Sequence, residues 1–155
     1  MLGTPPSEPN APLAHEAKRA GLTTARVLIV DDNAMNIALA RIVLEGENFE
    51  VEAAADGLQA MQKVASFRPE LILMDIQIPG SDGLELTQTL KRDPTTRHIL
   101  VIAFTAFAGH GDEAKLRTAG CDGSLAKPID VKTFGSQVRS LLEASRVIPN
   151  LTSAT

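Results

Sequence analysis

The sequence has one cysteine, Cys121, and neither tryptophan nor tyrosine among its 155 residues. A single cysteine excludes a disulfide framework within the chain and indicates a reducing compartment. Every apolar run is far shorter than the roughly 20 residues that a membrane-spanning helix needs, and the N-terminus lacks the charged start and apolar core of a secretory signal. We therefore expect a cytoplasmic protein without a membrane partner.

Basic residues are neither numerous nor concentrated. The chain has 15 Lys and Arg against 19 Asp and Glu, and its formal net charge is −4 at pH 7. Because binding to a phosphate backbone needs a concentrated basic surface, we do not expect direct contact with nucleic acid. The length and the hydrophobic fraction of 44% predict one globular domain with a substantial core.

The two ends of the sequence differ from its middle. Residues 1–24 are rich in proline and have too few large apolar residues to fold alone, which predicts a flexible N-terminal tail. This tail is either natural or an extension from cloning or an upstream start site. Residues 147–155 are predicted to form a C-terminal tail, which leaves residues 25–146 for the domain.

Strands and helices alternate between the two tails. Apolar runs at 27–30, 71–74 and 99–104 are typical of parallel strands buried on both faces. Weaker strands are predicted at 50–55 and 123–126, and helices at 33–47, 57–67, 84–91 and 112–119. A stripe of Val131, Phe134, Val138 and either Leu141 or Leu142 predicts a last helix. Strict alternation of this kind predicts an α/β fold, doubly wound, with a parallel sheet and helices on both faces.

Polar side chains follow the apolar strands at the point where each strand ends. Asp31 and Asp32 follow the first strand, Asp75 follows the third, and Thr105 and Lys127 end the fourth and fifth. In open α/β sheets, ligands bind beyond the carboxyl ends of the strands, so these groups are predicted to share one pocket. Three neighbouring carboxylates are unfavourable unless a cation joins them, and oxygen ligands suit Mg²⁺.

This set of groups has the chemistry that phosphoryl transfer requires. One carboxylate can act as a nucleophile and form an acyl phosphate, while Mg²⁺ and Lys127 neutralise oxygen charge. The hydroxyl of Thr105 and the amide of Ala106 can donate hydrogen bonds to phosphoryl oxygens, and the backbone carbonyl of Gln77 can add a metal ligand. Each residue alone has an ordinary explanation as a helix cap, strand residue or solvated lysine. The occurrence of all these residues together, in order at the strand ends, favours a functional site.

Short motifs occur in a fixed order over about residues 25–145. They are Val-Asp-Asp-Asn at 30–33, Leu-Ile-Leu-Met-Asp at 71–75, Pro79-Gly80 followed by Asp82-Gly83, Phe104-Thr105-Ala106, Gly120-Cys121-Asp122-Gly123 and Lys127-Pro128-Ile129. In these motifs the sequence resembles the receiver domain of bacterial two-component response regulators, either a single-domain regulator or the receiver segment of a hybrid histidine kinase. The resemblance implies a flavodoxin-like fold whose five parallel strands have the order 2-1-3-4-5.

The resemblance also implies a role for each site residue. Asp75 would accept a phosphoryl group from a phosphohistidine on a sensor histidine kinase or a histidine phosphotransfer protein. Asp32 would bind Mg²⁺ directly and Asp31 mostly through water, with the Gln77 carbonyl as a further ligand. Thr105, Lys127 and the Ala106 amide would contact the phosphoryl group, and the Lys127–Pro128 peptide bond is expected to be cis.

A receiver of this kind is a phosphorylation-controlled signalling module. It would catalyse only its own phosphorylation and dephosphorylation, as a monomer or weak dimer, and would then bind an unidentified downstream protein or pass the phosphoryl group on. A phosphatase of the haloacid dehalogenase type is disfavoured. That class needs a second aspartate two residues after the nucleophile, where this chain has Gln77.

Ser124 departs from the pattern of the family. The family usually carries Tyr or Phe three residues before the lysine of the Lys-Pro pair, and that ring turns inward when the threonine moves. With Ser124 in its place, output is predicted to depend on residues 106–112 and the helix that follows. The same departure leaves open a degenerate receiver that docks partners without being phosphorylated.

Overall fold

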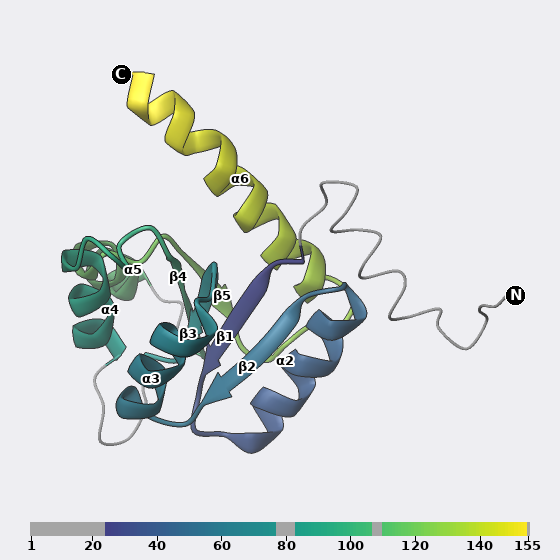
Figure 1. Ribbon diagram of the computed structural model, residues 1–155. Helices are drawn as coiled ribbons and strands as arrows, with labels where there is room; N and C mark the ends of the chain where they lie inside the picture. The colour runs from purple at the N-terminus through teal and green to yellow at the C-terminus, as the bar shows by residue number, and fades with distance from the viewer. Residues whose placement is uncertain (1–23, 77–82, 107–109, 155) are drawn as a thin grey trace, which may run out of the picture.

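The computed structural model describes residues 24–76, 83–106 and 110–154, so the predicted N-terminal tail lies outside this part except for residue 24. Strands and helices alternate as predicted (Figure 1). They are β1 (Arg26–Val30), α2 (Ala34–Gly46), β2 (Glu50–Ala54), α3 (Gly57–Phe67), β3 (Leu71–Met74), α4 (Gly83–Arg92), β4 (Leu100–Thr105), α5 (His110–Ala119), β5 (Gly123–Ala126) and α6 (Phe134–Ala154). Among the described helices, none combines the length and the apolar character that crossing a membrane requires.

The five strands form one parallel sheet in the order β2-β1-β3-β4-β5, which confirms the predicted topology. The chain winds from β1 to β2 on one side and then returns to β3 on the other side of β1. The switch in strand order therefore lies between β1 and β3, where Val30 pairs with Met74. Ligands of open α/β sheets bind at this place, beyond the strand ends.

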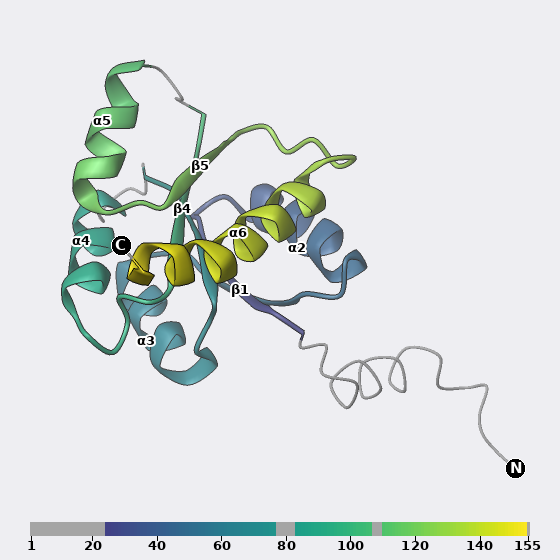
Figure 2. The same cartoon turned by 90° about the horizontal axis from the view of Figure 1, so that it is seen from above.

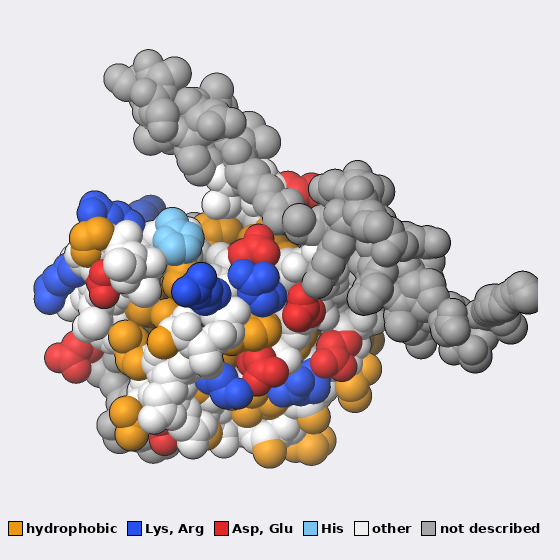
Figure 3. Space-filling model, viewed as in Figure 1, with side chains coloured by type: hydrophobic (Ala, Val, Ile, Leu, Met, Phe, Trp, Pro, Cys, Tyr) orange, Lys and Arg blue, Asp and Glu red, His pale blue; other side chains and the backbone are white. Residues whose placement is uncertain are grey.

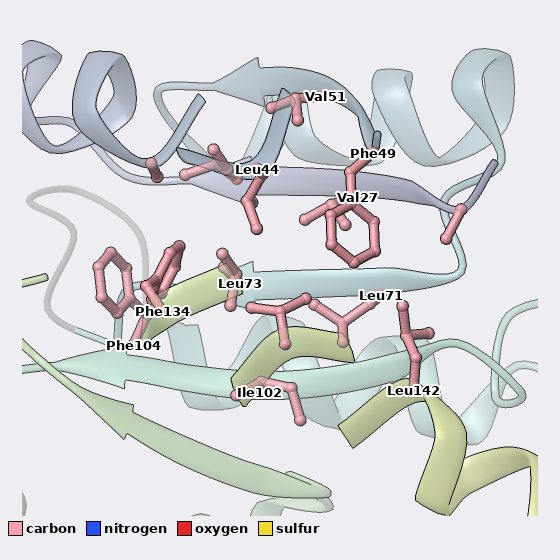
Figure 4. Close-up of a cluster of buried hydrophobic side chains, with 14 residues drawn as sticks. Val27, Leu44, Phe49, Val51, Leu71, Leu73, Ile102, Phe104, Phe134 and Leu142 are labelled. Atoms are coloured by element: carbon pink, nitrogen blue, oxygen red, sulfur yellow. The ribbon is translucent and has the colours of Figure 1, made fainter. Parts of the chain in front are cut away.

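Helices cover both faces of the sheet, and each face has its own apolar core. Successive side chains of a strand point to opposite faces. In β1, Val27 and Ile29 belong to one cluster, and Leu28 and Val30 belong to the other. Helices α2 and α6 close the first cluster, which Figure 4 shows, and α3 and α4 close the second (Figure 2). All four strand residues are fully buried, which explains the continuous apolar run.

Asn33 fixes where α2 begins, and with it the loop that carries two of the carboxylates. The side chain of Asn33 accepts a hydrogen bond from the backbone N–H of Asn36 at 3.0 Å, which makes it the N-cap. Because Asn33 takes that position, the Asp32 carboxylate is not needed to start the helix.

Helix α6 is longer than the sequence suggests. It begins at Phe134 and continues to Ala154, through most of the segment predicted as a C-terminal tail. A tail-like composition does not by itself end a helix, because each added residue other than proline gains one backbone hydrogen bond once the helix has started. The boundaries of the domain, at residues 25 and 146, stay predictions.

Candidate functional site

The carboxylates of Asp31 and Asp75 lie side by side, because the sheet pairing extends one residue beyond β1 and β3. The backbone N–H of Asp31 donates to the carbonyl of Ala54 at 3.0 Å, and that of Asp75 donates to the carbonyl of Val30 at 2.9 Å. Asp31 is 0% exposed and Asp75 is 6% exposed, whereas Asp32 is exposed. One carboxylate oxygen of each of these three residues lies within 4.8 Å of the others.

Lys127 supplies a positive charge to the two buried carboxylates. Its Nζ lies 2.8 Å from Oδ2 of Asp31 and 3.1 Å from Oδ2 of Asp75, and its side chain is 15% exposed. The lysine lies just beyond β5, where its backbone N–H donates to the carbonyl of Thr105 at 3.0 Å. The Lys127–Pro128 peptide bond is cis, as expected.

Burial and ion pairing shift the pKa of Lys127 in opposite directions. Burial lowers the pKa of Lys127, but the hydrogen bonds and negative charges of Asp31 and Asp75 together outweigh burial, so the net pKa lies above the ordinary lysine value. Lys127 is therefore positively charged at neutral pH. Three carboxylates and one ammonium leave a formal charge of −2, which a divalent cation would neutralise.

Asn36 is a residue of the site that the sequence analysis missed. Its side-chain Nδ2 donates to Oδ2 of Asp31 at 3.3 Å, and the backbone N–H of Asn33 donates to Oδ1 of Asp31 at 2.9 Å. The first turn of α2 thus orients the Asp31 carboxylate. The available signal was the position of Asn36 three residues after the N-cap, where a helical side chain faces back toward the loop.

Thr105 and Ala106 lie at the same edge of the sheet as the carboxylates. Thr105 is the last residue of β4 and is 4% exposed, while Ala106 is exposed. Gln77, predicted to lend a carbonyl oxygen, lies outside the described residues, as do residues 107–109 of the predicted output loop. Ser124 is exposed on β5, in register with Ala103 of β4.

The donor set fits Mg²⁺. All three side chains offer carboxylate oxygen, the ligand type that this hard cation prefers, and no nitrogen or sulfur donor belongs to the described cluster. Asp32, as the exposed member, lies on the side from which an ion and its remaining waters would arrive. Asp31 and Asp75 are held in place by backbone hydrogen bonds to neighbouring strands and by the ion pairs with Lys127.

Gly83, the first residue of α4, allows this helix to begin directly against the backbone of Asp75. A Cβ atom at this buried glycine would lie 2.7 Å from the carbonyl oxygen of Asp75 and 2.8 Å from Cα of Ile76. Real Cβ atoms do not approach backbone so closely. The hydroxyl of Thr87, which is 0% exposed, donates to the carbonyl of Gly83 at 2.8 Å and holds the first turn in place.

Substitution of Gly83 by alanine is expected to lower the free energy of unfolding by about 1–3 kcal/mol, because the added methyl group forces the backbone apart. The matched control is Gly46→Ala in α2, where a Cβ would meet nothing within 4 Å. That change should be neutral or stabilising, since alanine favours a helix by about 0.5–1 kcal/mol over glycine. Urea denaturation of both variants measures the difference. Equal effects would contradict the close approach of α4 to Asp75.

Comparison with known proteins points to one family. The profile of the response regulator receiver domain matches residues 27–139. The polar-differentiation response regulator DivK of Brucella anthropi is 46% identical over 116 residues, which make up 75% of this chain and 94% of that protein. The chemotaxis response regulator CheY4 of Vibrio cholerae superposes with a TM-score of 0.72 at 25% identity, over 77% of this chain and 99% of that chain.

A receiver joined to a kinase is also similar. The signal receiver domain of a signal transduction histidine kinase from Syntrophus aciditrophicus has a TM-score of 0.70 at 29% identity and covers 78% of this chain and 92% of that chain. The matched residues 27–139 extend from β1 into α6. The match therefore includes the sheet except for Arg26, and every strand end that carries a predicted site residue.

Proposed function

This chain belongs to the response regulator receiver domain family, and we propose that it is a phosphorylation-controlled switch whose phospho-accepting residue is Asp75. The observation that carries this proposal is the contact of Lys127 Nζ with both buried carboxylates, at 2.8 Å to Asp31 and 3.1 Å to Asp75. A buried aspartate held at a strand end by a lysine is a group that can take up a phosphoryl group and have its new charge compensated.

In the proposed reaction, an oxygen of the Asp75 carboxylate attacks the phosphorus of a phosphohistidine on a sensor histidine kinase or a histidine phosphotransfer protein. A phosphorus–oxygen bond forms and the phosphorus–nitrogen bond breaks. The imidazole nitrogen keeps the electron pair of the broken bond and takes up a proton from solvent. The product is an acyl phosphate on Asp75, and its negative charge lies on the phosphoryl oxygens.

The neighbouring residues position the phosphoryl group and compensate its charge. The Lys127 ammonium already lies 3.1 Å from Asp75 and would pair with a phosphoryl oxygen. The Thr105 hydroxyl and the Ala106 amide would donate hydrogen bonds from the adjacent strand end. A Mg²⁺ ion held by Asp31, Asp32, Asp75 and the Gln77 carbonyl would neutralise oxygen charge when bound. In this role the chain promotes only its own phosphorylation and dephosphorylation.

We propose that α2 contributes to docking of the phosphodonor protein. Three large hydrophobic side chains of this helix are exposed, Met35 by 78%, Leu39 by 37% and Ile42 by 69%, and their spacing places them on one face. Figure 3 shows hydrophobic side chains along α2 at the lower right. Because α2 starts directly after the Asp31 loop, a protein that covers this face would reach Asp75. The single cysteine favours the cytoplasm as the place of this reaction.

The intact mass of the protein after incubation with acetyl phosphate and Mg²⁺ tests the proposed function. We expect the wild type to gain one phosphoryl group, and we expect no gain in Asp75→Asn or when Mg²⁺ is removed by a chelator. The amide of asparagine keeps the shape of Asp75 but is a far weaker nucleophile than a carboxylate. An unlabelled wild type would support the alternative, a docking module that works without phosphorylation, for which Ser124 is the supporting observation.

A further inference from the structure

The Lys127 ammonium lies over an aromatic ring in addition to its contacts with the two carboxylates. Its Nζ is 5.1 Å from the centroid of the Phe104 ring, within the roughly 6 Å over which a cation is attracted to a ring face. We propose that Phe104 is a positioning residue that holds the Lys127 ammonium toward Asp75. This assignment rests on the role proposed above for Lys127 in phosphoryl transfer.

The ring itself has little freedom to move. Phe104 is 0% exposed and lies 5.7 Å, centroid to centroid, from the ring of Phe134, with an angle of 37° between the ring planes. Phe134 is 2% exposed at the start of α6. Figure 4 shows the two rings next to each other at one end of the cluster between the sheet and α6. The face that Phe104 presents to Lys127 is therefore set by packing of β4 against α6.

A fixed ring matters because the lysine side chain is not rigid. Four rotatable bonds separate the ammonium from the backbone, and holding them in one arrangement costs conformational entropy. Asp31 and Asp75 form ion pairs with the ammonium. Phosphorylation converts the Asp75 carboxylate into an acyl phosphate and changes that ion pair, whereas the Phe104 ring is the same before and after transfer.

Low exposure makes the contact with the ring effective. The side chain of Lys127 is 15% exposed, so water competes little for the ammonium. Cation–ring attraction is stronger at such desolvated positions than at the protein surface. Phe104 also lies next to Thr105 on β4, so one strand end carries both the ring beneath the lysine and the hydroxyl proposed to contact the phosphoryl group.

Fluorination of the ring separates this role from core packing. Substitution of Phe104 by 3,4,5-trifluorophenylalanine nearly keeps its size but withdraws electron density from the ring face, and the matched control is the same change at Phe134. We expect the labelling rate at saturating acetyl phosphate with Mg²⁺ to fall about 3- to 10-fold at position 104. We expect a change of less than about twofold at position 134, and an unchanged half-saturating concentration of acetyl phosphate for both.

A double-mutant cycle tests whether Phe104 acts through the lysine. In a Lys127→Met background with Mg²⁺ present, fluorination of Phe104 should have no further effect on the labelling rate. Equal effects at positions 104 and 134, or a loss at 104 that persists without the lysine, would overturn the proposal. Thermal denaturation of each variant shows whether a lower rate reflects unfolding.

The position of the ammonium is also measurable without the reaction. In the wild type, the ε-methylene protons of Lys127 should have chemical shifts displaced upfield by the Phe104 ring, and Phe104→Leu should remove the displacement. Absence of this displacement in the wild type would overturn the proposal even if Asp75 is labelled normally. If Asp75 is not labelled but the displacement is present, the proposed function fails while the placement of Lys127 by Phe104 holds.

Discussion

Replacement of Lys127 by methionine is expected to lower the free energy of unfolding of the metal-free protein by about 3–5 kcal/mol, the usual cost of removing one partner from a buried ion pair. Methionine keeps most of the apolar length of the lysine side chain but removes the charge. Asp31 and Asp75, exposed by 0% and 6%, would then face each other without the ammonium that now joins them. Urea denaturation in the presence of a chelator measures this loss.

The matched control for this prediction is Lys63→Met. Lys63 Nζ lies 2.6 Å from Glu52, but the two side chains are 39% and 40% exposed, so water screens the pair. Loss of such an exposed pair should cost no more than about 1 kcal/mol. Saturating Mg²⁺ should restore a large part of the stability of Lys127→Met and none of that of Lys63→Met. A Lys127→Met variant that is as stable as the control would contradict the charge arrangement at the site.

The dependence of stability on pH follows from the same ion pairs. The pKa of Lys127 is raised in the folded protein above its ordinary value, since the two aspartates outweigh the opposing effect of burial. A raised pKa means that the folded state holds its proton more tightly than the unfolded state. The stabilisation is therefore fully present below the ordinary lysine range and is lost as pH rises through the folded pKa. In Lys127→Met this alkaline loss should be smaller than in the wild type.

Most of the sheet could be predicted from local sequence, because strands buried on both faces leave a continuous apolar run. The predicted strands at 71–74 and 123–126 have the bounds of β3 and β5, and the predicted helix at 57–67 has those of α3. Val131 shows where pattern alone was insufficient. It fits the apolar spacing of the last helix, but it precedes that helix and is 55% exposed.

Some residues of the site can be recognised from the sequence, whereas others can be recognised only when the packing of the chain is known. Carboxylates at strand ends are visible in a sequence because the same chain segment defines both the strand and its end. The roles of Gly83 and Phe104 depend on which segments meet in space, the backbone of Asp75 in one case and the lysine of the Lys-Pro pair in the other. A glycine before a helix and a phenylalanine in a strand have common structural explanations, so neither could be assigned in advance.

Substitution of Asp32 by asparagine is expected to slow the phosphorylation of Asp75 without lowering the stability of the protein. Asp32 is the exposed member of the acidic cluster and is not the N-cap of α2. The free energy of unfolding without Mg²⁺ should therefore not fall, and it should rise if anything, because the change removes one of three neighbouring negative charges. The labelling rate with acetyl phosphate should fall at least about 100-fold, because loss of a metal ligand removes several kcal/mol of charge stabilisation in the transition state.

The control for Asp32→Asn is Glu45→Gln, which makes the same change of net charge at another exposed carboxylate, in the last part of α2. Within the described part of the chain, the one ion pair of Glu45 is with Arg41, whose Nη1 lies 3.5 Å from Oε2 of Glu45. Glu45 does not belong to the acidic cluster. Labelling of Glu45→Gln should match the wild type at every Mg²⁺ concentration. For Asp32→Asn, the Mg²⁺ concentration that gives half of the maximal rate should rise as well. Normal labelling of Asp32→Asn with an unchanged Mg²⁺ dependence would mean that the exposed carboxylate is not a metal ligand, and that Asp31 and Asp75 bind the ion without it.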